Sequence, residues 1–220
     1  MVGQHRLHPN VVIVCAGNLS TDRAITNPLS TAMQSRVVHI EMEMNHEIFM
    51  QDVALKQKWD SRIVAFLSFK PSALHDFRPD HNDKTFCCPR TWSFMNALIQ
   101  GKEVLESKAP LYAGTITSGT AVEFIQFTKV YASLPKLAEV LNDPTGCRVP
   151  GDPAVRYAMT TFLMEHTTED NFEKITEYVN RFSSEFRVLF FRGLMIQQPA
   201  LRRHAAFRAA MLELSRYLHD

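Results

Sequence analysis

The sequence lacks the features that mark secreted and membrane proteins. Its longest apolar stretch, residues 188–196, is interrupted by Arg192 and Gly193, and it falls well short of the ~20 residues that span a bilayer. Residues 1–10 are mostly polar and contain no apolar core of a signal peptide. We therefore expect a cytoplasmic protein with no membrane segment.

Cysteine is scarce, and its positions form no recognisable motif. Cysteine occurs at Cys15, Cys87, Cys88 and Cys147. The spacing matches neither a metal-binding nor a redox motif, and neighbours such as Cys87 and Cys88 rarely bridge each other. We therefore expect reduced thiols, as in a cytoplasmic protein. A zinc site that combines this pair with His75 and His81 is an alternative, but its spacing fits no common ligand pattern.

Positively and negatively charged side chains are present in nearly equal numbers. The chain has 24 lysines and arginines against 23 aspartates and glutamates, a formal net charge of +1. We therefore expect no general attraction to nucleic acid or to an acidic membrane. A nucleic-acid interpretation depends only on a local basic cluster, which is usually a solvated face. The cluster is Arg202, Arg203, His204 and Arg208.

Two segments near the N-terminus have the composition of β-strands. Residues 11–16 form a continuous, largely β-branched apolar run, which favours a strand buried on both faces of a parallel sheet. Residues 36–40 resemble a second strand. Apolar and acidic residues alternate over residues 37–43, which suggests a strand with one face exposed to solvent. Residues 26–35 suit a short helix between them. A lone parallel strand is unstable, so its neighbours must come from elsewhere.

From residue 46 onward the apolar spacing becomes helical, with a loop of turn residues at 142–151. The expected fold class is therefore an α/β remnant, the last strands of a parallel sheet, followed by mainly α structure. Capping residues and apolar faces mark the individual helices. The expected helices are residues 46–57, residues 60–68 capped by Asp60 or Ser61, one capped by Thr91, one after Gly119, one begun by Asp152 and Pro153, one opened by Thr168 with Phe172, Ile175, Val179, Phe182 and Phe186 on its face, and one with Phe207, Met211, Leu214 and Leu218.

A phosphate-binding loop is the most consequential absence. Such a loop cradles phosphate with the backbone amides of G-x-x-x-x-G-K-[ST], and its lysine and hydroxyl complete the site. Residues 114–121 have the glycine spacing, but they lack the lysine and the hydroxyl after it, and they follow Pro110 rather than a buried strand. We interpret them as a glycine turn before a helix. No apolar run ends in Asp-Asp or Asp-Glu, as a Walker B strand does.

The end of the first expected strand carries a family resemblance. Residues 14–18 follow a segment, residues 2–10, that contains Gly, Gln, Leu and Pro. Together they resemble the sensor 1 strand of AAA+ ATPases of the MoxR-like group. In that family a polar residue at the strand end helps orient the attacking water, and Asn18 matches it. An amide suits this role because it can donate to a phosphate oxygen and accept from water. The alternative is that Asn18 only caps or turns the loop.

A second match follows directly. Residues 29–37 resemble the family's helix that leads into the next strand, where an arginine serves as a finger for the adjacent subunit. Arg36 matches that arginine, and Arg23 is a further basic residue at the same edge. A guanidinium is always charged and can bind phosphate through two hydrogen bonds, which suits this role. The alternative for Arg36 is a surface arginine stabilised by the helix dipole.

A third match lies at residues 86–92, where a proline and an arginine open an expected helix. This segment resembles sensor 2 of the family, and Arg90 matches the sensing arginine. Its charge is unfavourable in the first turn of a helix unless an anion is near. The alternative is an arginine that stacks on Trp92 or pairs with Asp76, Asp80 or Asp83.

The resemblance covers most of the chain and implies its organisation. Residues 1–45 correspond to the C-terminal part of the α/β core, residues 46–110 to a helical lid with sensor 2, and residues 111–220 to a C-terminal helical region. It implies ATP-driven remodelling or chaperone-like work on a protein substrate, within a ring of like subunits or with an intact AAA+ partner. ATP and Mg²⁺ would be held chiefly by residues that this chain does not contain.

The missing Walker segments lie upstream of sensor 1 in that family. The chain can therefore be a truncated gene, an internal start, a split ATPase or an expressed fragment, and we do not expect it to hydrolyse ATP alone. The alternative function is a non-enzymatic helical interaction or regulatory protein derived from such an ATPase.

Overall fold

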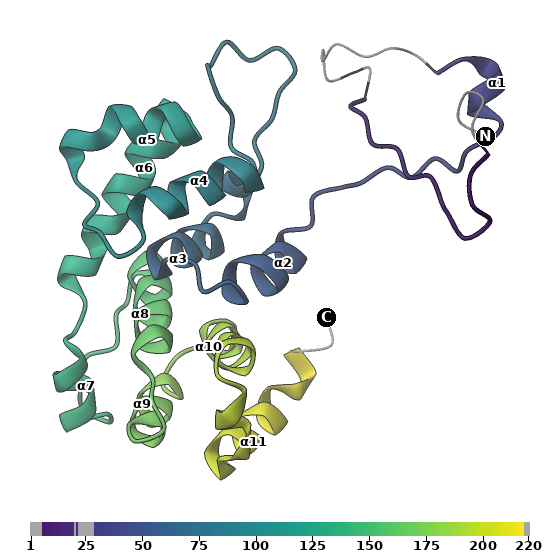
Figure 1. Cartoon of the computed structure of the whole chain (residues 1–220). Helices are drawn as coiled ribbons and strands as arrows, with labels where there is room; N and C mark the ends of the chain where they lie inside the picture. The colour runs from purple at the N-terminus through teal and green to yellow at the C-terminus, as the bar shows by residue number, and fades with distance from the viewer. Residues whose placement is uncertain (1–5, 20, 22–28, 218–220) are drawn as a thin grey trace. The chain divides into compact units, whose positions relative to one another are not determined.

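The computed structural model describes residues 6–19, 21 and 29–217. The chain divides into two compact units, residues 1–42 with 78–81 and residues 43–77 with 82–220. The predicted mainly helical character is confirmed for the described residues (Figure 1), where the only β-structure is an isolated antiparallel bridge between Asp76 and Cys87. Among these helices none is long and apolar enough to cross a membrane.

The first unit contains, in its described part, the short helix α1 (Thr31–Gln34) and extended chain. Ser30 caps α1, because its hydroxyl accepts a hydrogen bond from the amide of Met33 at 3.4 Å. The helix predicted over residues 26–35 is therefore present only in part, and residues 26–28 lie outside the described residues. No residue of α1 is buried, so this helix covers no core.

The strands predicted for residues 11–16 and 36–40 do not form in this structure. Their side chains are open to solvent, with Val12 84% and Val14 87% exposed in the first segment and Val38 88% and Ile40 83% exposed in the second. The physical reason is the absence, within the described residues, of neighbouring strands and covering helices. A parallel strand is stable only when both faces are covered, so its composition alone does not make it a strand.

The second unit is built from helices, and α5 and α6 lie at the opposite end of it from α10 and α11 (Figure 1). Its elements are α2 (His46–Phe49), the π-helix η2 (Met50–Leu55), α3 (Ser61–Phe69), η3 (Pro71–Leu74), α4 (Pro89–Ile99), η4 (Glu106–Lys108), α5 (Ala109–Ile116), α6 (Ser118–Lys129), η5 (Val130–Ser133), α7 (Leu137–Asn142), α8 (Pro153–His166), α9 (Phe172–Val179), α10 (Ser184–Gln197), η6 (Pro199–Arg203), α11 (Ala205–Leu214) and η7 (Ser215–Tyr217). The elements named η other than η2 are 3₁₀ helices.

Helix α3 is the centre of this unit. Residues 63–67 are all buried, and α3 packs against α8 along its length. The ring of Phe66 contacts Trp92 of α4 and Phe124 of α6, at centroid distances of 5.7 and 5.3 Å. Burying a side chain of this size contributes roughly 1.5–3 kcal/mol. Three other helices therefore take their positions from α3.

Several predicted helix boundaries are confirmed. Residues 46–55 are helical as α2 and η2, and the carboxylate of Asp60 caps α3 by accepting from the amide of Arg62 at 3.0 Å. Asp152 caps α8 by accepting from the amide of Val155 at 3.2 Å, and Pro153 is the first residue of that helix. The sequence was enough to predict these helix starts, because a capping side chain bonds only to the amides of the next few residues.

Two predicted boundaries are wrong. Thr91 does not cap α4 but lies in its first turn, after Cys88 as the capping residue. Thr168 does not open α9, which begins at Phe172. The apolar face expected to be one helix from Phe172 to Phe186 is divided between α9 and α10, with a turn between them. All five of its predicted apolar residues are buried, because the residues that meet in the core are the same in either arrangement.

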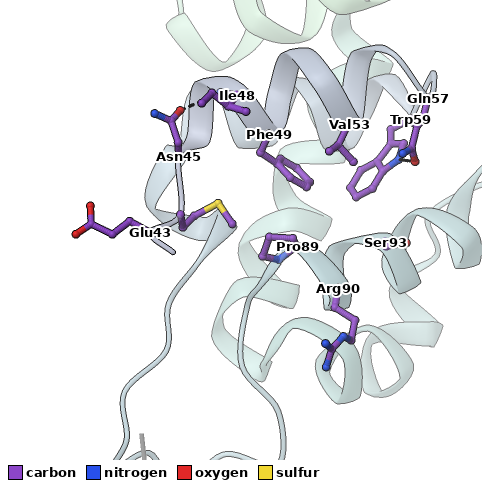
Figure 2. Close-up of a pocket in the computed structure, with 11 residues that line it drawn as sticks. Glu43, Asn45, Ile48, Phe49, Val53, Gln57, Trp59, Pro89, Arg90 and Ser93 are labelled. Carbon is purple, nitrogen blue, oxygen red and sulfur yellow. Dashed lines mark hydrogen bonds between the residues drawn. The ribbon is translucent and has the colours of Figure 1, made fainter. Parts of the chain in front are cut away.

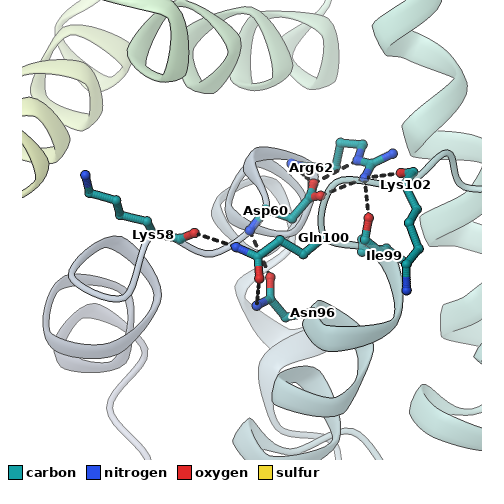
Figure 3. Close-up of polar contacts among 7 residues, drawn as sticks. All are labelled: Lys58, Asp60, Arg62, Asn96, Ile99, Gln100 and Lys102. Carbon is teal, nitrogen blue, oxygen red and sulfur yellow. Dashed lines mark hydrogen bonds and ion pairs between the residues drawn. The ribbon is translucent and has the colours of Figure 1, made fainter.

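A polar clamp joins the start of α3 to the end of α4 (Figure 3). Arg62 pairs with Asp60 at 2.6 Å and donates to the carbonyls of Ile99 and Lys102 at 3.0 and 2.8 Å. The side chain of Asn96 accepts from the amide of Asp60 at 2.9 Å. The carboxylate of Asp60 is only 8% exposed, and the hydrogen bonds to it raise the pKa of Arg62 above its ordinary value. The clamp satisfies backbone carbonyls that would otherwise be orphaned at the end of α4.

We expect Arg62→Ala to lower the free energy of unfolding by about 3 kcal/mol, because it leaves the Asp60 carboxylate buried without its cation. Urea unfolding followed by circular dichroism measures this change. Lys129→Ala is the matched control, because Lys129 pairs with Glu106 on the surface, where both side chains are more than half exposed. That substitution should cost less than about 1 kcal/mol. Equal losses from the two substitutions would contradict the clamp.

Lys58 precedes the clamp in a left-handed backbone conformation, with φ of 53°. Its carbonyl accepts from the side chain of Gln100 at 3.2 Å (Figure 3). A side chain makes this conformation costly, so Lys58→Gly should raise the free energy of unfolding by about 0.5–1 kcal/mol. Lys56→Gly is the control, because Lys56 has right-handed φ of −65° and should lose about 1 kcal/mol. The same unfolding assay applies, and a loss of stability in Lys58→Gly would be the contrary result.

Candidate functional site

The sequence-predicted site residues lie in different units. Asn18 and Arg36 belong to the first unit and Arg90 to the second. Asn18 is exposed on extended chain. Arg36 follows α1, and its guanidinium donates to the carbonyl of Ala32, which is the helix-end arrangement of a surface arginine. Arg23 lies outside the described residues.

The first turn of α4 positions Arg90. Cys88 precedes the helix, Pro89 is its first residue, and Pro is favoured there because its missing N–H is not needed. The hydroxyl of Thr91 accepts from the amide of Cys88 at 2.9 Å and lies 3.1 Å from the carbonyl of Phe86. These contacts fix the backbone on both sides of Arg90. The direction of its Cα–Cβ bond is therefore set, while the side chain itself is exposed.

Arg90 borders a hollow of about 560 Å³ between α4 and the α2–η2 helix. Phe49 and Trp59 form an apolar wall of this hollow, with their rings edge to face at 5.3 Å. Glu43 is the acidic residue that lines it. Figure 2 shows Phe49, Val53 and Trp59 on one side of the hollow and Pro89, Arg90 and Ser93 on the other.

Arg90 has no ion pair, hydrogen bond or aromatic stacking partner among the described residues. The alternative of stacking on Trp92 does not hold, because that indole is fully buried and donates to the carbonyl of Ala73 at 2.7 Å. A guanidinium carries five N–H donors in a planar fork that fits phosphate or carboxylate. At the positive end of a helix, an uncompensated cation is stabilised when an anion binds. The arrangement is suited to binding an anion.

Residues 114–121 do not form a phosphate-binding loop in this structure. Gly114 lies inside α5 and Gly119 inside α6, and Thr117 joins the two helices. Thr117 has φ of 73°, a conformation that disfavours residues other than glycine. The two glycines are therefore helical residues, and the predicted glycine turn before a helix is wrong, because the chain turns at Thr117 instead.

The proposed zinc ligands also do not come together. No group of three or more His, Cys, Asp or Glu side chains in the described part of the chain could hold a metal ion. Cys87 is buried, and its thiol donates to the carbonyl of Ile116 at 2.9 Å. Burial raises the pKa of this thiol, which disfavours the thiolate that zinc requires.

The basic cluster near the C-terminus is divided between two helices. Arg202 and Arg203 end η6, and Arg208 lies on α11. The guanidinium of Arg202 donates to the carbonyl of Met195 at 3.0 Å, and the ring of His204 lies 5.2 Å from that of Phe172. Two members of the cluster thus have structural contacts, which weakens the nucleic-acid interpretation.

Sequence reasoning missed the apolar wall beside Arg90. The helical spacing of residues 46–57 predicts an apolar face of Ile48, Phe49 and Val53 that packs into the core, but Ile48 is 59% exposed and all three line the hollow. The signal in the sequence was the nearness of Trp59 to this helix, and its packing against Phe49 needs a reversal of the chain at Lys58. Only the folded chain shows that reversal.

The buried thiol gives a direct test of the site's packing. We expect Cys87 in the folded chain to react with iodoacetamide at least about tenfold more slowly than Cys15, because only the exposed thiolate is a nucleophile. Cys15 is exposed and serves as the internal control. Peptide mass spectrometry after timed alkylation at pH 8 measures both rates. Equal rates in the native chain, or a zinc-dependent protection of Cys87, would contradict this structure of the site.

Comparisons with known proteins identify no family for this chain. No protein-family model, no curated protein and no solved structure matches the chain.

Proposed function

We propose that this chain is the nucleotide-sensing part of an AAA+ ATPase of the MoxR-like type. The observation that carries the proposal is Arg90, an exposed cation in the first turn of α4 with no partner among the described residues. Because residues 86–92 resemble sensor 2, the ligand we propose for this arginine is the γ-phosphate of ATP.

The surroundings of Arg90 support an anionic ligand of this kind. A phosphate there would interact with the guanidinium and with the positive end of the α4 dipole. The hollow is open to solvent, and the guanidinium of Arg90 points away from the apolar wall of Phe49 and Trp59 (Figure 2). Water therefore screens its attraction for an anion. Glu43 opposes an anion, so the net affinity of the chain alone should be modest.

Two further residues of this chain would contribute to such a site. Asn18 would orient the attacking water, and Arg36 would leave its contact with Ala32 to reach the nucleotide of an adjacent subunit. The segments 11–16 and 36–40 would then be the last strands of the ATPase sheet, which restores the α/β part of the expected fold. ATP and Mg²⁺ would be held chiefly by residues that this sequence does not include, within a ring that remodels a protein substrate.

The alternative is a non-enzymatic regulatory protein that binds an intact AAA+ homologue. Two exposed apolar segments favour it, because solvent-exposed runs such as Val11 to Val14 are typical of interaction sites. Co-purification with a full-length AAA+ protein, without any nucleotide affinity of the chain itself, would support this alternative over the sensing function.

The test of the sensing function is nucleotide binding without turnover. We expect MgATP to bind the chain weakly and to change the fluorescence of Trp59, which lines the hollow. Arg90→Ala should weaken binding by at least about tenfold, because a charge-assisted hydrogen bond contributes roughly 1.5–3 kcal/mol. ATP hydrolysis by the chain alone should stay at the background rate.

Arg208→Ala is the matched control, because Arg208 is also an exposed helical arginine. It should bind MgATP as the original chain does. The proposal fails if Arg90→Ala and the original chain have the same affinity, or if neither binds. Turnover of ATP that is lost in Arg90→Ala would show instead that the chain is an ATPase by itself.

A further inference from the structure

A second cavity of the helical unit lies beside the polar clamp of Asp60 and Arg62. It has a volume of about 250 Å³, which is below the roughly 300–1,000 Å³ of pockets that hold drug-sized ligands. Its lining is mainly polar, and the apolar part consists of Trp59, Val64 and Met164. A cavity of this size and composition is suited to one small polar molecule.

In the described part of the chain, three α-helices end at this cavity. Gln100 directly follows α4, Glu165 lies in the last turn of α8, and Gln197 is the last residue of α10. The carbonyl end of a helix carries a partial negative charge, which favours a positively charged group nearby. Arg62 and Arg202 already donate to carbonyls near the ends of α4 and α10. The end of α8 is therefore the most negative part of the cavity.

Glu165 adds a full negative charge at that end. Its carboxylate makes no hydrogen bond or ion pair with the described residues, whereas the carboxylate of Asp60 is paired with Arg62. The pKa of Arg62 is raised first by its hydrogen bond to Asp60 and more weakly by the charge of Glu165. Glu165 therefore acts on the clamp side of the cavity, where a bound ammonium group would be stabilised.

Lys58 contributes a positive charge to the same lining. Its carbonyl accepts from the side chain of Gln100, while its ammonium group makes no hydrogen bond or ion pair within the described part of the chain. In Figure 3 the side chain of Lys58 extends away from Asp60 and Gln100, so its charge is not part of the clamp. The cavity is thus lined by an unpaired cation and an unpaired anion that do not pair with each other.

These observations point to a ligand that carries both charges. We infer that the cavity binds a free amino acid as its zwitterion. Glu165 and the end of α8 hold the ammonium group of the ligand, and Lys58 holds its carboxylate. The side-chain amide of Gln197 makes no hydrogen bond with the described residues, and an amide can donate to a carboxylate or accept from an ammonium group. Val64 and Met164 contact an aliphatic side chain of the ligand.

A ligand with a single charge fits less well. A simple cation is repelled by Lys58, and a simple anion is repelled by Glu165 and by the helix ends. A zwitterion meets both charges of the lining at once. Both side chains are exposed, so water competes for them and the affinity is modest. The inference is independent of the proposed function, because Arg90 does not line this cavity.

The test is a calorimetric titration of the whole chain with L-valine and with two analogues that each lack one charge. N-acetyl-L-valine has no ammonium group, and L-valinamide has no carboxylate. We expect L-valine to bind at least about fivefold more tightly than either analogue, because each analogue leaves one charge of the lining unpaired. No binding of L-valine or glycine up to about 10 mM would overturn the inference. Equal binding of L-valine and L-valinamide would also overturn it, since that result would mark a site for simple cations.

Variants of the two charged residues assign the site. Glu165→Gln and Lys58→Gln should each weaken L-valine binding at least about fivefold, whereas Glu165→Gln should leave the weaker binding of N-acetyl-L-valine unchanged. Glu169→Gln and Lys56→Gln are the matched controls, because both residues are exposed and lie outside the cavity. They should bind L-valine within about twofold of the original chain.

Circular dichroism checks that the four variants keep the helical fold. Equal effects of the cavity and control substitutions on L-valine binding would overturn the inference. Glu165→Gln should leave MgATP binding unchanged, whereas Arg90→Ala should leave L-valine binding unchanged. Failure of the amino-acid site and failure of the proposed function are therefore distinguishable in the same set of proteins.

Discussion

The helical unit depends on the pairing of Asp60 and Arg62 at the junction of α3 and α4. Asp60 caps α3, and Arg62 carries the compensating charge while donating to the carbonyl of Ile99 at the end of α4. A buried carboxylate without this cation would cost several kcal/mol. The pair therefore fixes the angle between two helices whose apolar faces share the same core. The position of Arg90 at the other end of α4 follows from that constraint.

The apolar packing of α3 explains why one clamp has such wide consequences. Phe66 contacts side chains of α4 and α6, and the length of α3 packs against α8. A shift of α3 would therefore open several interfaces together, because close-packed interiors transmit small displacements. The hollow beside Arg90 lies in the same unit and is bounded by Trp59, directly before Asp60. Stability and the candidate anion site are in this way coupled through adjacent residues.

Local chemistry predicted some elements well and others poorly. The caps at Asp60 and Asp152 were predictable because a side-chain oxygen needs only the next few amides. The division between α9 and α10 was not, because Phe172 to Phe186 keep helical spacing across the turn that separates them. The strand predictions failed because composition describes what a segment can bury, whereas pairing needs strands that the described residues do not contain.

The sequence by itself determined the mainly helical character of the chain after residue 45, the buried apolar face from Phe172 to Phe186 and the absence of a complete phosphate-binding loop. These properties depend on spacing and on residue type. Only the tertiary structure decided that Arg90 is exposed and unpaired among the described residues, that Cys87 is buried, and that a hollow lies beside α4. Exposure and pairing are set by residues distant in sequence, and their contacts exist only after α2, α3 and α4 have packed together.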